Sequence, residues 1–303
     1  MKLPLYPKSQ QSGSSTYINL NVIIFFMIGF FIRKSFYDLW DNMFRIVLLN
    51  LGFIALAAIP ILVPRLISLF IDSQALEIIF VALGILLCSV YLSTASYTIK
   101  SISDYGSFGF SDFIRNIKKA WSAGLVMGFF VFLLFIILFV VMPFYMGFES
   151  ILGLVLGAVV FWTMVFGLLS CQYYFSVCAR LINQTDSDGT PINDKTLSGR
   201  NLIKAFKKCM LVLLDNSGFS FFLMLHNIVV LLISVVLAFL FPGPAGILLY
   251  ADEALRLRLL KYDWLEANPD ADRRKIPWDA LLIEEREKTG TRTFKNFIFP
   301  WKD

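Results

Sequence analysis

The sequence has little of what catalytic and metal-binding proteins use. Its 303 residues include one histidine, His226, and four cysteines, and only 16% of them are charged. Cys88, Cys171, Cys178 and Cys209 lack the paired spacing of zinc or disulfide frameworks, so we expect buried structural thiols. The sequence contains no glycine-rich phosphate loop, no Ser/His/Asp arrangement and no His-x-x-x-His pattern. These absences argue against an enzyme, and we expect neither a cofactor nor a bound metal.

Hydrophobic side chains dominate the composition instead. They make up 57% of the chain, including 31 phenylalanines, and the mean hydropathy is +0.71. Because soluble domains are less apolar, lipid is the expected solvent for most of the chain. The net charge of +5 does not indicate nucleic-acid binding, since the basic residues flank hydrophobic segments. There they meet anionic headgroups of the lipid bilayer, which are the partners we expect.

Six hydrophobic segments predict transmembrane helices. The segments lack the alternating pattern of barrel strands, and a helix satisfies every backbone polar group within its own segment. The first five are long enough to cross a bilayer, and the sixth is weaker. Their bounds are about 46–71, 76–97, 121–146, 151–178, 217–241 and 245–262. The expected fold class is all-α, a polytopic helical membrane protein.

The distribution of basic residues predicts the orientation. Nearly all of the 27 Lys and Arg residues fall on one side of these spans, and the connections on the other side, at 72–75, 147–150 and 242–244, are very short. Loops rich in Lys and Arg stay in the cytoplasm. We therefore expect a protein of the cell membrane with its C-terminus in the cytoplasm.

A basic amphipathic segment precedes each odd-numbered span. Phe113–Lys119 aligns without gaps with Leu202–Lys208, and Leu39–Arg45 is a looser relative. In each segment, apolar residues three or four apart form one stripe and basic residues occupy the remaining arc. Such helices lie in the membrane interface. The chain thus predicts three hairpins, each preceded by an interfacial helix.

The remaining chain divides into an N-terminal segment (1–45), a transmembrane domain (46–262) and a cytoplasmic tail (263–303). The apolar stretch 18–32 reaches about 22 Å as a helix, short of the roughly 30 Å hydrocarbon core, so an interfacial or tilted helix is favoured over a seventh span. The end of the tail is either an amphipathic segment that returns to the interface or a peptide that docks on a partner. Its aromatic residues are Phe294, Phe297, Phe299 and Trp301.

Two polar pairs within the spans are candidate functional residues, because ionisable groups at depth usually mark function. His226 and Asn227 fall near the middle of the fifth span, where a hydrogen bond between helices is favoured over a proton relay. Asp252 and Glu253 fall inside the sixth segment. Arg256 follows them by four and three residues, so we expect this helix to neutralise itself. That cluster makes the segment either a full span or a short, re-entrant one.

One further polar residue, Asn50 in the first span, belongs to one of three motifs that the chain shares with a known family. Leu49-Asn50-Leu51 is followed nine residues later by Pro60, SDFIRNIKKAW precedes the third span, and LIKAFKKCMLVLLDN precedes the fifth. Over most of residues 30–262 the chain resembles the YesL-like (DUF624) family of bacterial polytopic membrane proteins. The Thr-x-Gly stretch usual in that family is replaced by residues 61–65, which read Ile-Leu-Val-Pro-Arg, and the C-terminal tail is also unlike that family's.

The resemblance implies an accessory membrane protein without a known catalytic site, encoded beside carbohydrate-uptake systems. We therefore expect a non-enzymatic accessory or assembly factor for carbohydrate transport, with an ABC permease or another membrane protein as its partner. The alternative is a small-solute secondary transporter with a polar path through Asn50, His226 and Asp252. A membrane enzyme acting on lipid would need acidic or histidine clusters at the interface, which the sequence lacks.

Overall fold

The computed structural model describes residues 20–70, 73–148, 150–181, 199–273 and 276–290, and every regular element within these ranges is a helix. The predicted aromatic docking tail, Phe294 to Trp301, lies outside them. In chain order the elements are α1 (Leu20–Asp41), α2 (Met43–Ser68), α3 (Gln74–Ser103), α4 (Phe110–Ile136), a π-helical turn (Ile137–Val141), α5 (Met142–Met146), α6 (Ile151–Cys171), α7 (Tyr174–Leu181), α8 (Gly199–Asp215), α9 (Ser217–Val236), α10 (Gly243–Ala267), α11 (Trp278–Leu281) and α12 (Ile283–Thr289).

Five helical stretches among the described residues are long and apolar enough to cross a membrane. They correspond to the first five predicted spans, so the prediction of an all-α, multi-pass membrane protein is confirmed at this level. Their bounds are Met43–Ser68, Ala75–Ser103, Phe110–Met146, Ile151–Arg180 and Ser217–Val236.

The predicted sixth span, 245–262, is not one of these five. It belongs to α10, a continuous helix of 25 residues that carries Asp252, Glu253, Arg256 and Arg258 in its middle. Most of its side chains are buried against other helices, and it packs on α1, α2, α3, α7 and α9. A helix enclosed by protein on several sides tolerates charged residues that a lipid-facing helix does not, because its neighbours supply counter-charges.

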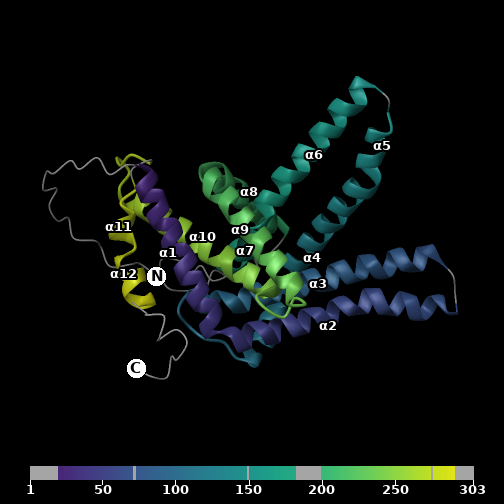
Figure 1. Ribbon diagram of the computed structural model, residues 1–303, viewed down its shortest axis with the longest axis horizontal. Coiled ribbons are helices and arrows are strands. Elements are labelled where there is room, and N and C mark those ends of the chain that lie inside the picture. Colours follow the sequence, from purple (N-terminus) through teal and green to yellow (C-terminus); the bar gives the residue numbers. More distant parts are fainter. Residues whose placement is uncertain (1–19, 71–72, 149, 182–198, 274–275, 291–303) are drawn as a thin grey trace, which may run out of the picture.

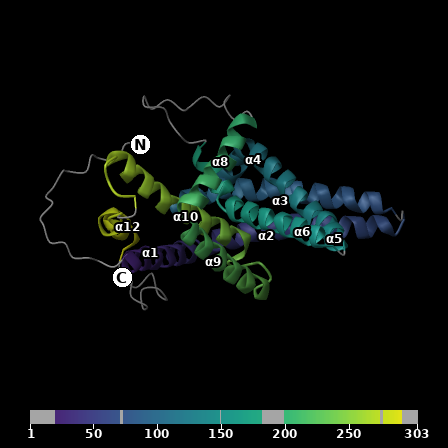
Figure 2. The same cartoon turned by 90° about the horizontal axis from the view of Figure 1, so that it is seen from above.

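The helical hairpins spread outward from this buried helix (Figures 1 and 2). The α2–α3 hairpin and the hairpin formed by α4, α5 and α6 point in different directions, and their tips are far apart in Figure 1. The turn between α9 and α10 contacts Asn50, the eighth residue of α2, and so lies near the base of the first hairpin. The third hairpin therefore extends less far than the other two.

Only one of the three predicted interfacial helices is a separate helix. α8 contains Leu202–Lys208 and is divided from α9 by Asn216, whereas Phe113–Lys119 runs directly into its span as part of α4. Leu39–Arg45 crosses the junction of α1 and α2 at Asn42. The separation of α8 has a local cause, since Asp215 and Asn216, residue types that favour turns, interrupt the helix there.

Glycines in α4 allow it to pack closely against α3. A Cβ atom on Gly124 would lie 2.4 Å from Cα of Val90, and one on Gly128 would lie 3.1 Å from Cα of Leu86. The Ser93 hydroxyl donates to the Ala120 carbonyl at 2.9 Å across the same interface. Small residues and hydrogen bonds of this kind join helices in lipid, where no hydrophobic effect drives association.

Candidate functional site: a buried charged centre around α10

Asp252 is the first of the charged residues that α10 buries. Its side chain is 0% exposed, and Arg180 of α7 approaches both of its oxygens, with Nε 3.1 Å from Oδ1 and a terminal nitrogen 2.5 Å from Oδ2. The Ser103 hydroxyl donates to Oδ2 as well. Two-point pairing with a guanidinium is the geometry that best compensates a buried carboxylate. The pair joins α7 to α10.

Glu253 pairs with a different neighbour, α1. The Lys34 ammonium lies 3.4 Å from its Oε1, and the Ser35 hydroxyl donates to Oε2. Lys34 also donates to Asp38 at 2.5 Å and to the Ser103 carbonyl at 3.2 Å. Both Lys34 and Glu253 are at most 2% exposed. Consecutive carboxylates of α10 therefore pair with two different helices, α7 and α1.

The prediction that Arg256 neutralises these carboxylates within its own helix is wrong. Arg256 donates to Asp104 Oδ1 at 2.6 Å and to Glu285 Oε1 at 2.8 Å, and its guanidinium lies 5.0 Å from the centre of the Tyr105 ring. Asp252 and Glu253 already have cations from α7 and α1. The Arg256 side chain is free to extend to acceptors at the end of α3 and in α12.

We call the resulting cluster the charged centre, and it connects five parts of the chain. It links α1, the end of α3, α7, α10 and α12 at the base of the hairpins. Charges removed from water are tolerated when they are paired and hydrogen-bonded, and breaking one pair strands its partner. Its members are Lys34, Asp38, Asp104, Arg180, Asp252, Glu253, Arg256 and Glu285.

The C-terminal segment packs against the charged centre as far as Gly290. The Tyr105 hydroxyl donates to Glu285 Oε2 at 2.7 Å, and Arg33 of α1 donates to the Gly290 carbonyl at 2.6 Å. Burial alone raises the pKa of a carboxyl group, but the Arg256 guanidinium and the Tyr105 hydroxyl hold the pKa of Glu285 below its usual value. Trp278 is also buried, so α11 and α12 are docked by apolar and ionic contacts together.

Asn50 of α2 has a structural role, because its side chain holds the turn between α9 and α10. Its Nδ2 donates to the carbonyls of Leu240 and Pro242 at 3.0 and 2.7 Å, and its Oδ1 accepts from the Ala245 amide at 2.9 Å. A Cβ atom on Gly243, whose φ is +63°, would lie 2.3 Å from Asn50 Nδ2, so glycine is required there. The sequence did not indicate this turn as the partner of Asn50.

His226 and Asn227 lie on α9 and are not members of the charged centre. The His226 ring packs edge-on against Tyr250 of α10, with centroids 4.8 Å apart, and against Phe31 of α1 at 5.6 Å. Its Nδ1 and the Oδ1 of Asn227 have no hydrogen-bond partner among the residues that the structure describes. The hydrogen bond expected between helices is therefore not made by these two atoms.

A smaller polar cluster joins the α8–α9 junction to α10. Lys261 donates to Asp215 at 2.6 Å and to Asn216 at 3.0 Å, and the Arg258 guanidinium lies 3.8 Å from the centre of the Phe219 ring. Asp215 therefore pairs across helices, while Asn216 occupies the position before α9 without a capping hydrogen bond. α10 thus places five of its charged side chains against other helices or their ends: Asp252, Glu253, Arg256, Arg258 and Lys261.

The residues that sequence reasoning missed are the partners of α10: Lys34, Asp104, Arg180 and Glu285. Each is a charged residue at the margin of an apolar stretch, which is the signal that could have indicated them. The described residues contain no group of three or more His, Cys, Asp or Glu side chains arranged to hold a metal ion. The geometry supports a structural and coupling role, because each carboxylate of the pair at 252 and 253 is engaged by a cation of the same chain.

Comparisons with protein-family models, with curated proteins and with solved structures found no match to this chain. The resemblance to the YesL-like family therefore stays a prediction.

Proposed function

We propose that this chain is a non-enzymatic accessory or assembly factor for a carbohydrate transport system in the cell membrane. In this proposal α10 is the sixth span and completes the third hairpin. The C-terminus lies in the cytoplasm, where Lys and Arg residues of α4 and α8 meet anionic headgroups.

One observation carries the proposal: Asn50 and Asp252, two of the three residues on the alternative's polar path, are occupied by the chain itself. Asp252 is held at both oxygens by Arg180, and the amide of Asn50 binds three backbone groups of one turn. A transport site offers polar groups to its solute, and releasing these groups would leave buried charges and carbonyls without partners. The centre is therefore suited to hold the helices in place.

The outer parts of the hairpins support a role in association with another membrane protein. Side chains such as Leu62 and Leu66 of α2 and Phe139 of the π-helical turn are more than half exposed. The hairpins diverge (Figure 1), and in this proposal their outer surfaces face lipid on several sides. A permease of the ABC type could pack between them through the same close contacts that join helices in lipid.

The test is capture from membranes in a mild detergent. The tagged full-length protein is expected to retain a transport permease, and removing residues 294–303 is expected to weaken this capture while leaving the thermal unfolding of the protein unchanged. A matched control removes only the charge of Lys295 by substitution with Gln. Solute uptake by vesicles that contain the purified protein alone would contradict the accessory role.

A secondary transporter is the alternative, and one observation favours it. His226 Nδ1 and Asn227 Oδ1 are buried atoms without a partner in the described part of the chain, next to a helix that carries carboxylates. A proton relay needs such groups. It predicts that His226→Ala and Asp252→Asn abolish uptake in vesicles while the protein remains folded, whereas the accessory role predicts no uptake in any variant.

A further inference from the structure

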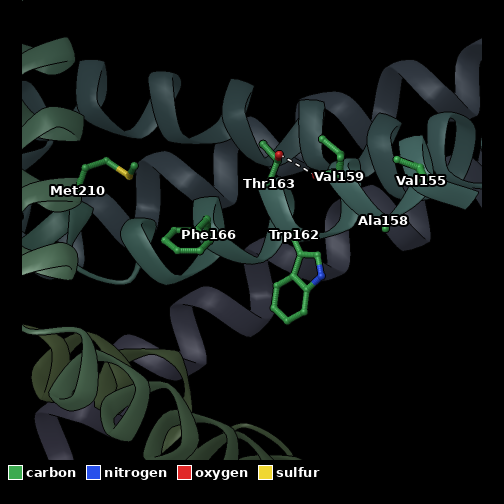
Figure 3. Close-up of a pocket in the computed structure, with 7 residues that line it drawn as sticks. All are labelled: Val155, Ala158, Val159, Trp162, Thr163, Phe166 and Met210. Atoms are coloured by element: carbon green, nitrogen blue, oxygen red, sulfur yellow. Dashed lines mark hydrogen bonds between the residues drawn. The ribbon is translucent and has the colours of Figure 1, made fainter. Parts of the chain in front are cut away.

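The apolar hollow on α6 offers a ligand little polar chemistry (Figure 3). It has a volume of about 540 Å³ and is lined by side chains such as Phe166 and Met210. The Thr163 hydroxyl in its wall already donates to the Val159 carbonyl at 2.8 Å. A site gains its specificity from a few placed polar groups, which this wall lacks. The buried carboxyl group of Glu253 on α10 has more specific chemistry.

The two consecutive carboxyl groups of α10 are compensated unequally. Arg180 donates to both oxygens of Asp252, at 3.1 and 2.5 Å. Glu253 is contacted by no guanidinium of the described residues, and the Lys34 ammonium lies 3.4 Å from its Oε1. That ammonium lies closer to Asp38, at 2.5 Å. A buried carboxylate without a close cation of its own is costly, and the cost is avoided when the group takes up a proton.

Asp38 and Glu253 meet at this ammonium. Their carboxyl groups lie within hydrogen-bonding reach of each other, and two ionised carboxylates at that distance repel. A hydrogen bond between them needs one proton, because an ionised carboxylate can only accept. With that proton the two groups carry a single negative charge, which the single charge of Lys34 balances. Without it, a second negative charge would be enclosed without a counter-charge.

The other cations around the two groups are engaged elsewhere. Arg180 is held by the neighbouring carboxylate of α10, and Arg256 donates to Asp104 and Glu285 at 2.6 and 2.8 Å. Lys100 of α3 lies beside Arg180 and Asp104. Among the described residues, no cation is therefore left for a second negative charge. The neutral groups around Lys34 and Glu253 are the Ser35 hydroxyl, the Ser103 carbonyl, the Tyr105 ring and the Tyr250 side chain, against which His226 of α9 packs.

We propose that Asp38 and Glu253 form a proton-binding site that holds one proton at neutral pH. The proton lies in the hydrogen bond between the two carboxyl groups, and the Lys34 ammonium balances the charge that remains. Asp38 is 15% exposed and Glu253 is 1% exposed, so the proton exchanges with water through Asp38. Releasing the proton places an unbalanced charge between α1 and α10 and weakens their contact. The site depends neither on the proposed accessory role nor on a solute path.

Infrared spectroscopy of the full-length protein tests this site. The protein is purified in a maltoside detergent, which has no carbonyl group, and spectra are recorded at pH 7 in H₂O and in D₂O. A protonated carboxyl group gives a C=O stretching band that is separate from those of ionised carboxylates and that shifts in D₂O. We expect this band in the unsubstituted protein. Glu253→Gln and Asp38→Asn are each expected to remove it, because one carboxylate beside one ammonium needs no proton. Glu284→Gln removes an exposed carboxylate of α12 and is the control that keeps the band.

Unfolding in sodium dodecyl sulfate gives a second, independent readout. Glu253→Gln keeps a neutral group of similar shape and is expected to unfold at nearly the same detergent fraction as the unsubstituted protein. Asp252→Asn strands the Arg180 guanidinium and is expected to unfold at a clearly lower fraction. Lys34→Gln leaves one negative charge unbalanced, and adding Asp38→Asn is expected to recover stability and to retain the band of a neutral Glu253.

Two results overturn the proposal. One is a spectrum of the unsubstituted protein at pH 7 without the band of a protonated carboxyl group, and the other is a band that both Glu253→Gln and Asp38→Asn retain. If Glu253→Gln does not fold, the spectrum of Asp38→Asn decides.

Discussion

Arg180 of α7 donates a hydrogen bond to each carboxylate oxygen of Asp252, although 72 residues separate the two in sequence. Asp252 is 0% exposed and Arg180 is 15% exposed. Removing both charges of an enclosed ion pair from water is costly, so the pair adds little net stability. Removing one partner destabilises the protein strongly, because the other charge stays buried without a counter-charge. The pair thus adds a buried charged interaction to the packing of α7 against α10.

Replacing Arg180 by Gln is therefore expected to be strongly destabilising. The substitution leaves the Asp252 carboxylate buried without a cation, which costs about 3–5 kcal/mol in the free energy of unfolding. The measurement is unfolding of the detergent-solubilised protein by titration with sodium dodecyl sulfate. Arg115→Gln breaks an exposed pair with Asp112 and is the matched control, for which we expect less than about 1 kcal/mol. An equal loss of stability in the two variants would show that the Arg180–Asp252 pair has no special structural role.

Asn50→Leu is expected to destabilise the turn between α9 and α10. The change removes the partners of the Leu240 and Pro242 carbonyls and of the Ala245 amide, and unsatisfied buried groups cost about 1–3 kcal/mol each before relaxation. Hydrogen exchange of residues 237–246 measures the loosened turn. Asn227→Leu is the control of the same shape, with little effect expected because its Oδ1 has no partner among the described residues. Protection that is unchanged in Asn50→Leu would refute the structural role.

The sequence predicted the five apolar spans because hydropathy is a property of each segment by itself. It did not predict the partners of Asp252 and Glu253, since Lys34 is 219 residues from Glu253 and nothing local relates them. Spacing on one helix favoured Arg256, but spacing says nothing of competing cations on neighbouring helices. The separate α8 was predictable from Asp215-Asn216, whereas the burial of α10 depends on packing that hydropathy does not describe.

The docking of α12 is expected to depend on pH through Glu285. The pKa of this carboxyl is depressed in the folded protein, so its contribution is fully present above the unfolded value of about 4.3 and is lost as the pH falls through the lower folded value. We expect the amide protection factors of residues 276–290, corrected for the intrinsic exchange rate at each pH, to be lower below pH 4 than at pH 7. Glu285→Gln should exchange fast already at pH 7, while Glu284→Gln, at an exposed position, should follow the unsubstituted protein. Exchange that does not respond to either change would mean that apolar contacts alone hold α12.

Two glycine substitutions are expected to have opposite effects, because only one of the two glycines lies where α3 and α4 approach closely. Gly124→Ala introduces a Cβ atom 2.4 Å from Cα of Val90, and because this neighbour is backbone the helices must separate, at a cost of about 1–3 kcal/mol. Gly29→Ala in α1 meets nothing within 4 Å and is expected to stabilise its helix by up to about 1 kcal/mol, since alanine loses less backbone entropy. Unfolding in sodium dodecyl sulfate measures both. A Gly124→Ala protein as stable as the unsubstituted one would mean that α3 and α4 pack less closely than these contacts require.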